Sequence, residues 1–195
     1  MSVKTVVKVD DIKKDAESIK CPVEKSLYLI NEFLSGPMCG KCFPCSMGSY
    51  EARVRLRKVV DGNGSEDDLQ HIKKIADEML VASMCKKGKD VAKYLLEWLD
   101  SDVFISHVEG LCPEKTCKAF IEYRILTDKC TMCGICLDAC KYAAIHGESR
   151  KPFMSGYQPF EIRQLKCVKC GDCIKVCPEE AIILLDAKAA EPVEV

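Results

Sequence analysis

The sequence lacks several features that would assign it to a common class of protein. No segment approaches the run of about 20 apolar residues that a membrane-spanning helix needs, so we expect no membrane span. Residues 1–20 contain no apolar stretch long enough for a secretory signal, which predicts a cytoplasmic protein. The 29 basic residues are balanced by 30 acidic ones, so the net charge favours neither nucleic acid nor an anionic membrane as a partner.

Cysteine, in contrast, is abundant, with 15 cysteines in 195 residues. A disulfide framework does not fit, because the number is odd, a secretory signal is missing, and most cysteines stand in C-x-x-C steps. Such steps suit metal chelation in a reducing compartment. The sequence therefore predicts a metal-bearing protein.

An internal repeat occupies the C-terminal part of the chain. CTMCGICLDACKYAAI, which starts at Cys130, matches CVKCGDCIKVCPEEAI, which starts at Cys167. In each run three close thiolates can hold one iron–sulfur cluster, while the fourth reaches the other cluster. Zinc, the alternative metal, prefers two separated C-x-x-C pairs. We predict two 4Fe–4S clusters, one on Cys130, Cys133, Cys136 and Cys177, and one on Cys167, Cys170, Cys173 and Cys140.

These two runs make the stretch from Leu126 to Leu185 similar to the bacterial two-cluster ferredoxins. The second run has the proline of that family, Pro178, after its last cysteine, whereas the first run has Lys141 there. The substitution changes the local backbone and charge but removes no ligand. The resemblance implies a ferredoxin-like domain, and residues 146–166 between the runs are expected to form a strand pair.

Four short amphipathic helices are expected before the repeat, joined by short turns. Together they predict a small four-helix bundle, so the whole chain is expected to be α+β. The Leu, Met and aromatic residues of these helices, Tyr50 among them, are expected in the core. The helices are expected from Val23 to the stop at Gly36-Pro37, then up to Val60, from the Ser65 cap to Leu80, and from Lys89 to Leu99.

The stretch GPMCGKCFPCSMG carries a third group of thiols, on Cys39, Cys42 and Cys45. A cubane needs a fourth ligand, and Cys85 lies in the loop before the fourth helix. If the helices are antiparallel, that loop and the loop before the second helix lie at the same end of the bundle. We therefore predict a 4Fe–4S cluster on these four cysteines, with zinc and a radical-forming cluster as the alternatives. A radical enzyme would typically have C-x-x-x-C-x-x-C, whose first gap is longer.

The motif CGKCFPC, the bundle and Cys85 together resemble the iron–sulfur module that ends the NADH-oxidising flavoprotein subunit of complex I and of related hydrogenases and formate dehydrogenases. The match covers Leu27 to Leu99, and electron-bifurcating hydrogenases continue into a two-cluster ferredoxin domain as this chain does. The resemblance implies an electron-transfer cluster that accepts electrons from flavin mononucleotide. Ser46 stands where the family usually has arginine.

The flavin- and nicotinamide-binding domain of that family is missing here, as is any glycine-rich phosphate loop. We expect no flavin or NAD on this chain alone and no catalysis by it. Its expected partners are a flavoprotein subunit that binds FMN or FAD and NAD(P)H, other iron–sulfur subunits, and soluble ferredoxin. The predicted function is electron relay in a multi-subunit oxidoreductase. A free-standing ferredoxin-type carrier and an iron–sulfur redox sensor are the alternatives, although a sensor would need an effector surface such as a basic DNA-reading helix.

Three cysteines and one histidine remain after this assignment: Cys21, Cys112, Cys117 and His107. Three thiols and an imidazole are a common structural zinc set, and bifurcating hydrogenases carry a similar connector, which suggests a zinc hinge. The alternative is that they are free buried thiols and an ordinary core histidine. A 2Fe–2S cluster more often uses four cysteines.

Five segments are expected in all. They are an N-terminal arm or edge strand (1–22), the bundle domain (23–105), a connector with the candidate zinc site (106–124), the ferredoxin domain (125–187) and a tail without a core pattern (188–195).

Overall fold

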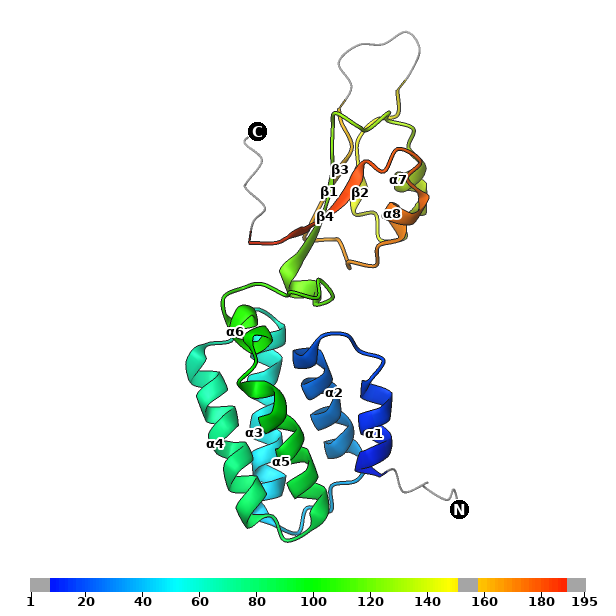
Figure 1. The fold of residues 1–195 in the computed structure, drawn as a ribbon. Helices are drawn as coiled ribbons and strands as arrows, with labels where there is room; N and C mark the ends of the chain where they lie inside the picture. The colour runs from blue at the N-terminus through cyan, green and yellow to red at the C-terminus, as the bar shows by residue number, and fades with distance from the viewer. Residues whose placement is uncertain (1–7, 151–157, 189–195) are drawn as a thin grey trace, which may run out of the picture. The chain divides into compact units, whose positions relative to one another are not determined.

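The computed structural model describes residues 8–150 and 158–188. The chain divides into two compact units, Met1–Ala119 and Phe120–Val195 (Figure 1). The first unit is helical and the second contains short strands and helices, so the chain is α+β as expected. No helix in the described ranges is long and apolar enough to cross a membrane.

The first unit is built on helices that pack through their apolar faces. Neighbours in sequence pack together from α2 to α5, and α5 also packs against α2. The helix α1 packs on α2, and α6 contacts α2, α3 and α4. Completely buried side chains such as Phe33, Leu56 and Leu95 form the core between them. The helices are α1 (Val9–Ala16), α2 (Pro22–Ser35), α3 (Phe43–Val60), α4 (Glu66–Ala82), α5 (Lys86–Leu99) and α6 (Asp102–Val108).

The start of α4 shows how local sequence fixes a helix end. Ser65 Oγ accepts a hydrogen bond from the Asp68 amide at 3.2 Å, and Asp68 accepts one from the Ser65 amide at 3.2 Å, which makes a capping box. Arg55 of α3 donates to Asp68 at 2.8 Å. The Asp68 side chain is buried, so one carboxylate both begins α4 and ties it to α3.

Two expectations for this unit are wrong. Residues 9–16 form the helix α1, with Val9, Ile12 and Ala16 buried, where an arm or edge strand was expected; residues 1–7 lie outside the described ranges. Tyr50, expected in the core, is 52% exposed, and Val54 on the same side of α3 is 39% exposed. The core face of α3 is formed instead by Cys45, Ser49, Ala52, Leu56 and Val59.

The second unit has two antiparallel strand pairs. The strand β1 (Ile121–Ile125) pairs with β4 (Ile182–Asp186), Ile121 standing opposite Asp186, and β2 (Ile145–His146) pairs with β3 (Glu161–Ile162). The latter is the strand pair expected between the cysteine runs. The short helices α7 (Ile135–Ala139) and α8 (Asp172–Val176) begin within the runs. The buried residues Tyr123, Ile145, Phe160, Ile162 and Ile182 form a core together with cysteines of both runs.

The expected connector, 106–124, is divided between the units. Its first part contains the end of α6 and a loop of the helical unit, and its last residues contain the 3₁₀ turn η1 (Lys118–Phe120) and most of β1. Of the expected tail, 188–195, the structure describes Lys188 alone.

Candidate metal centres

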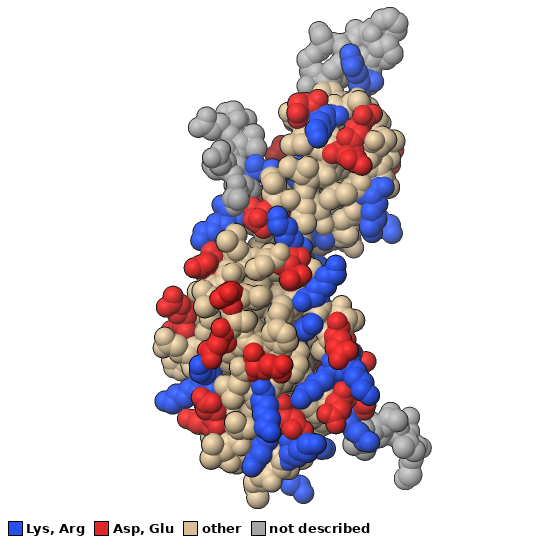
Figure 2. Space-filling model, in the orientation of Figure 1, with Lys and Arg blue, Asp and Glu red and all other residues tan. Residues whose placement is uncertain are grey.

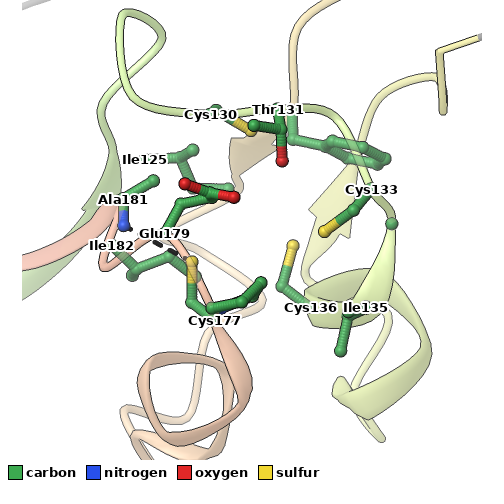
Figure 3. Close-up of a pocket in the computed structure, with 13 residues that line it drawn as sticks. Ile125, Cys130, Thr131, Cys133, Ile135, Cys136, Cys177, Glu179, Ala181 and Ile182 are labelled. Carbon is green, nitrogen blue, oxygen red and sulfur yellow. Dashed lines mark hydrogen bonds between the residues drawn. The ribbon is translucent and has the colours of Figure 1, made fainter.

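One cavity of the second unit is lined by cysteines from both runs. Figure 3 shows the sulfurs of Cys130, Cys133, Cys136 and Cys177 directed toward a common space. Apolar side chains, among them Ile125 and Ile182, form much of the rest of its wall, together with Thr131 and Glu179. The structure thus brings the last cysteine of the second run to the three close cysteines of the first.

A second cavity has the reciprocal set. It is lined by Cys140 from the first run and by the three close cysteines of the second run, Cys167, Cys170 and Cys173. Tyr123 of β1 also lines this cavity, and its hydroxyl is 3.0 Å from the position that a Cβ on Gly171 would take. This is the exchange of fourth ligands that two-cluster ferredoxin loops require.

The two cysteine loops have the same backbone conformation at equivalent positions. Met132 and Lys169 have φ of 58° and 59°, and Gly134 and Gly171, which precede α7 and α8, have φ of 84° and 75°. Left-handed backbone costs a non-glycine residue about 1–2 kcal/mol. Both repeats accept that cost at the same place, so the loop conformation is required to direct the three sulfurs inward.

Backbone amides donate to the sulfur of the fourth cysteine in each run. The Ala144 amide donates to Cys140 Sγ and the Ala181 amide to Cys177 Sγ, both at 3.4 Å. Amide hydrogen bonds to cluster sulfurs help to set the reduction potential. The sequence signal for these two hydrogen bonds is the Ala-Ile dipeptide that follows the fourth cysteine of each run, at 144–145 and 181–182.

The third set of thiols lies at one end of the helical unit. Cys42 is the N-cap of α3 and Cys85 is the N-cap of α5, and these helix starts meet at the lower end of Figure 1. Cys42 and Cys45 are buried, whereas Cys39 and Cys85 are exposed. The positive ends of two helix dipoles therefore lie beside the four sulfurs and suit an anionic cluster.

Burial and neighbouring sulfurs raise the pKa of a thiol in each of two sets. The pKa of Cys45 rises to about 11, first through burial and then through the charges of Cys42, Cys85 and Cys39. Burial, followed by the charges of the other thiols of its set, likewise raises the pKa of Cys136 to about 11. These thiols are protonated at neutral pH without a metal, so cluster binding must displace their protons.

Gly88, in the first turn of α5, leaves room for the sulfur of Cys45. A Cβ at this position would lie 2.9 Å from Cys45 Sγ and 2.6 Å from Ser83 Oγ. Both distances are below ordinary contact. The absence of a side chain at residue 88 therefore allows α5 to approach the buried thiol closely.

The remaining three cysteines and His107 form one buried group. The ligand atoms of Cys21, His107, Cys112 and Cys117 all lie within 4.8 Å of one another. His107 Nε2 is 3.3 Å from Cys21 Sγ and 3.3 Å from Cys117 Sγ. A tetrahedral zinc, with bonds of about 2.3 Å to sulfur and 2.0 Å to nitrogen, would place such ligands about 3.5 Å apart. The donor set therefore fits zinc in both chemistry and spacing.

The ring of His107 is oriented by its own helix. Its Nδ1 is 2.7 Å from the Val103 carbonyl, and since a carbonyl only accepts, Nδ1 carries the proton. In a metal site the neutral ring would present Nε2, without a proton, to the metal. Without a metal, burial lowers the pKa of His107, but hydrogen bonds with Cys112 and Cys21 outweigh burial and raise it to about 10.

Two protein-family models match separate parts of the chain. The NADH-ubiquinone oxidoreductase-F iron-sulfur binding region matches residues 26–101, and the 4Fe-4S dicluster domain matches residues 129–181. The chain therefore carries both of these iron–sulfur domains. It binds 4Fe–4S clusters.

The curated relatives that the chain matches are longer than it is. NADP-reducing hydrogenase subunit HndC of Solidesulfovibrio fructosivorans is 30% identical over 135 residues, which is 68% of this chain and 27% of the relative. The F component of the NADH-quinone oxidoreductase of Mycobacterium tuberculosis is 31% identical over 81 residues, 40% of this chain and 18% of the relative. The beta component of the NADP(+)-dependent formate dehydrogenase of Moorella thermoacetica is 31% identical over 75 residues, which is 38% of this chain and 11% of the relative. The matched part is thus a small fraction of each relative.

The two matched regions divide the candidate metal ligands. Cys39, Cys42, Cys45 and Cys85 lie in the oxidoreductase-F region, and the eight cysteines of the repeat lie in the dicluster domain. Cys21, His107, Cys112 and Cys117 lie outside both. The buried Cys and His group is therefore a separate feature of the chain.

Proposed function

We propose that this chain is an iron–sulfur electron-transfer subunit of a multi-subunit, flavin-dependent oxidoreductase linked to NAD(P)H. The observation that carries the proposal is the union of an oxidoreductase-F iron–sulfur region and a dicluster domain in one chain. The relatives are named as subunits of an NADP-reducing hydrogenase, an NADH-quinone oxidoreductase and an NADP(+)-dependent formate dehydrogenase.

Three clusters are proposed, one for each set of four cysteines. In this proposal α2 to α5 form a four-helix bundle that holds the first cluster, and the repeat holds the other two. A bound 4Fe–4S cluster supplies a one-electron carrier. The protein holds it with thiolates, donates amide hydrogen bonds from Ala144 and Ala181 to sulfur, and shields it with apolar walls.

A structural zinc is proposed for the group of Cys21, His107, Cys112 and Cys117. All four residues are buried, and the closeness of their ligand atoms supports a closed site without an open position for a substrate. Zinc has no redox chemistry under these conditions, so its role would be to fasten the N-cap of α2 to α6 and the loop that follows it.

The proposed partner is a flavoprotein subunit, with other iron–sulfur subunits and soluble ferredoxin as further electron donors or acceptors. Any electron bifurcation would take place at the flavin of that partner. A free-standing carrier is the second candidate, because the dicluster domain by itself resembles soluble ferredoxins.

Anaerobic purification from the native source, with metal analysis and identification of bound subunits, tests this function. Three 4Fe–4S clusters correspond to about twelve irons per chain. We expect that iron content, one zinc and a flavin-containing subunit in the same complex. Zinc without iron would overturn the electron-transfer role, and an iron-loaded lone monomer would favour the soluble carrier.

A further inference from the structure

Exposed apolar side chains extend from the end of the helical unit that carries Cys42 and Cys85 along the outer side of α3. Phe43, Met47, Tyr50 and Val54 follow one another at helical spacing along the outer side of α3, and Phe43 is 75% exposed. Val81 at the end of α4 and Met84 beside Cys85 are each 82% exposed. Single exposed apolar residues are ordinary, but a group gathered near a metal centre indicates a binding surface. We name these six side chains the apolar face.

The surroundings of the apolar face carry positive charge. Residues 33–50 and 79–89 contain no Asp or Glu, but they contain Lys41, Lys86, Lys87 and Lys89. The tip at the lower end of the helical unit is tan and blue in Figure 2. Arg53 lies over the Tyr50 ring, with its Cζ 4.4 Å from the centroid. Lysines could simply balance the charge of a cluster, but that would not explain the apolar side chains between them.

We propose that the apolar face docks a redox partner protein whose contact surface has an apolar centre and an acidic rim. The proposal rests on the proposed function. The exposed thiols of Cys39 and Cys85 lie at this end, so a docked partner would bring its electron carrier close to the cluster. A second copy of this chain is a poor occupant, because its lysines would face the same lysines.

The test uses the complex purified with its flavin-containing subunit, and it compares two double variants. We expect Lys86→Glu with Lys87→Glu to slow reduction of this chain's clusters by the partner about tenfold or more at low salt, with convergence toward the wild-type rate at high salt. Met47→Glu with Tyr50→Glu should lower the fraction of chain that co-elutes with the partner. Lys74→Glu and Ile105→Glu, exposed residues of the same unit, are the controls and should change neither quantity.

The outcomes separate this proposal from the proposed function. Wild-type rates and co-elution in both double variants would overturn the docking surface while leaving electron relay intact. Carbodiimide cross-links from these lysines to a second copy of the chain would also overturn it. If no co-purifying flavoprotein reduces the wild-type clusters, the proposed function fails instead. Iron content and reduction by dithionite should match in all variants.

A second, independent inference concerns Ser83, which is 3% exposed. Its hydroxyl has no hydrogen-bond partner within residues 8–150 and 158–188. Both Ser83 Oγ and Cys45 Sγ lie within 3 Å of the Cβ position missing from Gly88, at 2.6 and 2.9 Å. A buried unpaired hydroxyl costs about 1–3 kcal/mol, so an acceptor is to be expected nearby when the protein carries its metal.

The structure assigns that acceptor to the Cys45 thiolate sulfur, which would hold the proposed cluster. A hydrogen bond donated to a cluster sulfur stabilises the more negative, reduced form and raises the potential. Ser83 is thus a positioning residue that tunes the cluster, and this assignment rests on the proposed cluster at Cys39, Cys42, Cys45 and Cys85.

The midpoint potential of the bundle cluster, measured by redox titration with EPR detection on the iron-loaded chain, tests this role. We expect Ser83→Ala to lower the ratio of reduced to oxidised cluster at a fixed solution potential by about three- to tenfold, a tenfold change being 59 mV for one electron. Ser83→Thr, which keeps the hydroxyl, should restore the wild-type value.

Ser26→Ala is the matched control. Ser26 is also buried in the helical unit, but its hydroxyl donates to the Pro22 carbonyl at 2.9 Å. Its loss should destabilise α2 without moving the potential. An unchanged potential in Ser83→Ala with full iron content, or an equal shift in both variants, would overturn the assignment. A wild-type chain without an EPR signal from this cluster would instead overturn the cluster itself.

Discussion

Replacement of Gly88 by alanine is the sharpest test of how α5 approaches the cluster proposed on Cys39, Cys42, Cys45 and Cys85. The new Cβ would lie 2.6 Å from Ser83 Oγ, and 2.9 Å from both Ser83 Cβ and Cys45 Sγ. These atoms belong to two short, buried side chains that cannot turn away together. The first turn of α5 must therefore move, and Cys85, the N-cap of that helix, must move with it.

The size of the effect follows from two opposing terms. Alanine is favoured over glycine inside a helix by about 0.5–1 kcal/mol. Overpacking of a tight site costs about 1–3 kcal/mol. The difference between these terms is a net loss in the free energy of unfolding of about 1 kcal/mol, within a range of about 0–2.5 kcal/mol. The displaced Cys85 should also impair cluster assembly.

Gly48→Ala is a matched control on α3. A Cβ there would lie 3.0 Å from Cγ and Sδ of Met79, which are atoms of a long, flexible side chain. The assay is iron per chain together with the unfolding transition. We expect Gly88→Ala to fall from about twelve irons toward about eight, the loss of one 4Fe–4S cluster, while Gly48→Ala keeps its iron. Full iron content and wild-type stability in Gly88→Ala would refute the reasoning.

Other expected results concern each remaining feature of the chain. Asp68→Asn should lower the free energy of unfolding by about 1–2 kcal/mol in urea denaturation, since it weakens the Ser65 capping box. Burial acts to raise the pKa of Asp68, but hydrogen bonds from Ser65 and nearby positive charges lower it below 3.8. Its contribution should therefore be complete above pH 3.8 and be lost as the pH falls through the lower, folded pKa; a flat acid profile would contradict this. Cys177→Ala should remove the cluster held by the three close cysteines of the first run, although Cys177 itself belongs to the second run. Mass spectrometry would then show about eight irons per chain in place of about twelve, and EPR would show the loss of one cluster signal. His107→Ala should release zinc but leave iron unchanged in metal analysis, and equal loss of both metals would argue against separate sites.

The sequence predicts which cysteines come together better than it predicts the packing around them. Cys130, Cys133 and Cys136 are close together in sequence, and the loop that carries them directs their sulfurs into one cavity. The expected antiparallel order of the helices was enough to place Cys85 at the same end of the unit as Cys39, Cys42 and Cys45. The hydrogen bonds that the Ala144 and Ala181 backbone amides donate to sulfur were not assigned to these residues in advance. They depend on left-handed backbone at non-glycine residues, and the identity of such a residue does not predict that conformation.

Helix faces were less predictable for a physical reason. The core face of α3 uses small residues such as Ser49 and Ala52, so it is weakly apolar, while its solvent face carries Tyr50 and Val54. Apolar periodicity identifies a face but not what covers it. In α1, only Val9, Ile12 and Ala16 mark the buried side among many charged residues, so the segment reads as a polar arm.

The pairing of Cys21 with His107 spans 86 positions of the chain. A metal held there would close a ring that contains α2 to α5 entirely. By analogy with a disulfide over a loop of this length, the closure would remove about 4–5 kcal/mol of entropy from the unfolded chain. It would also make the helical unit resistant to fragmentation: a single protease cut in the turn at residues 61–64 would leave both pieces attached until a chelator opened the ring.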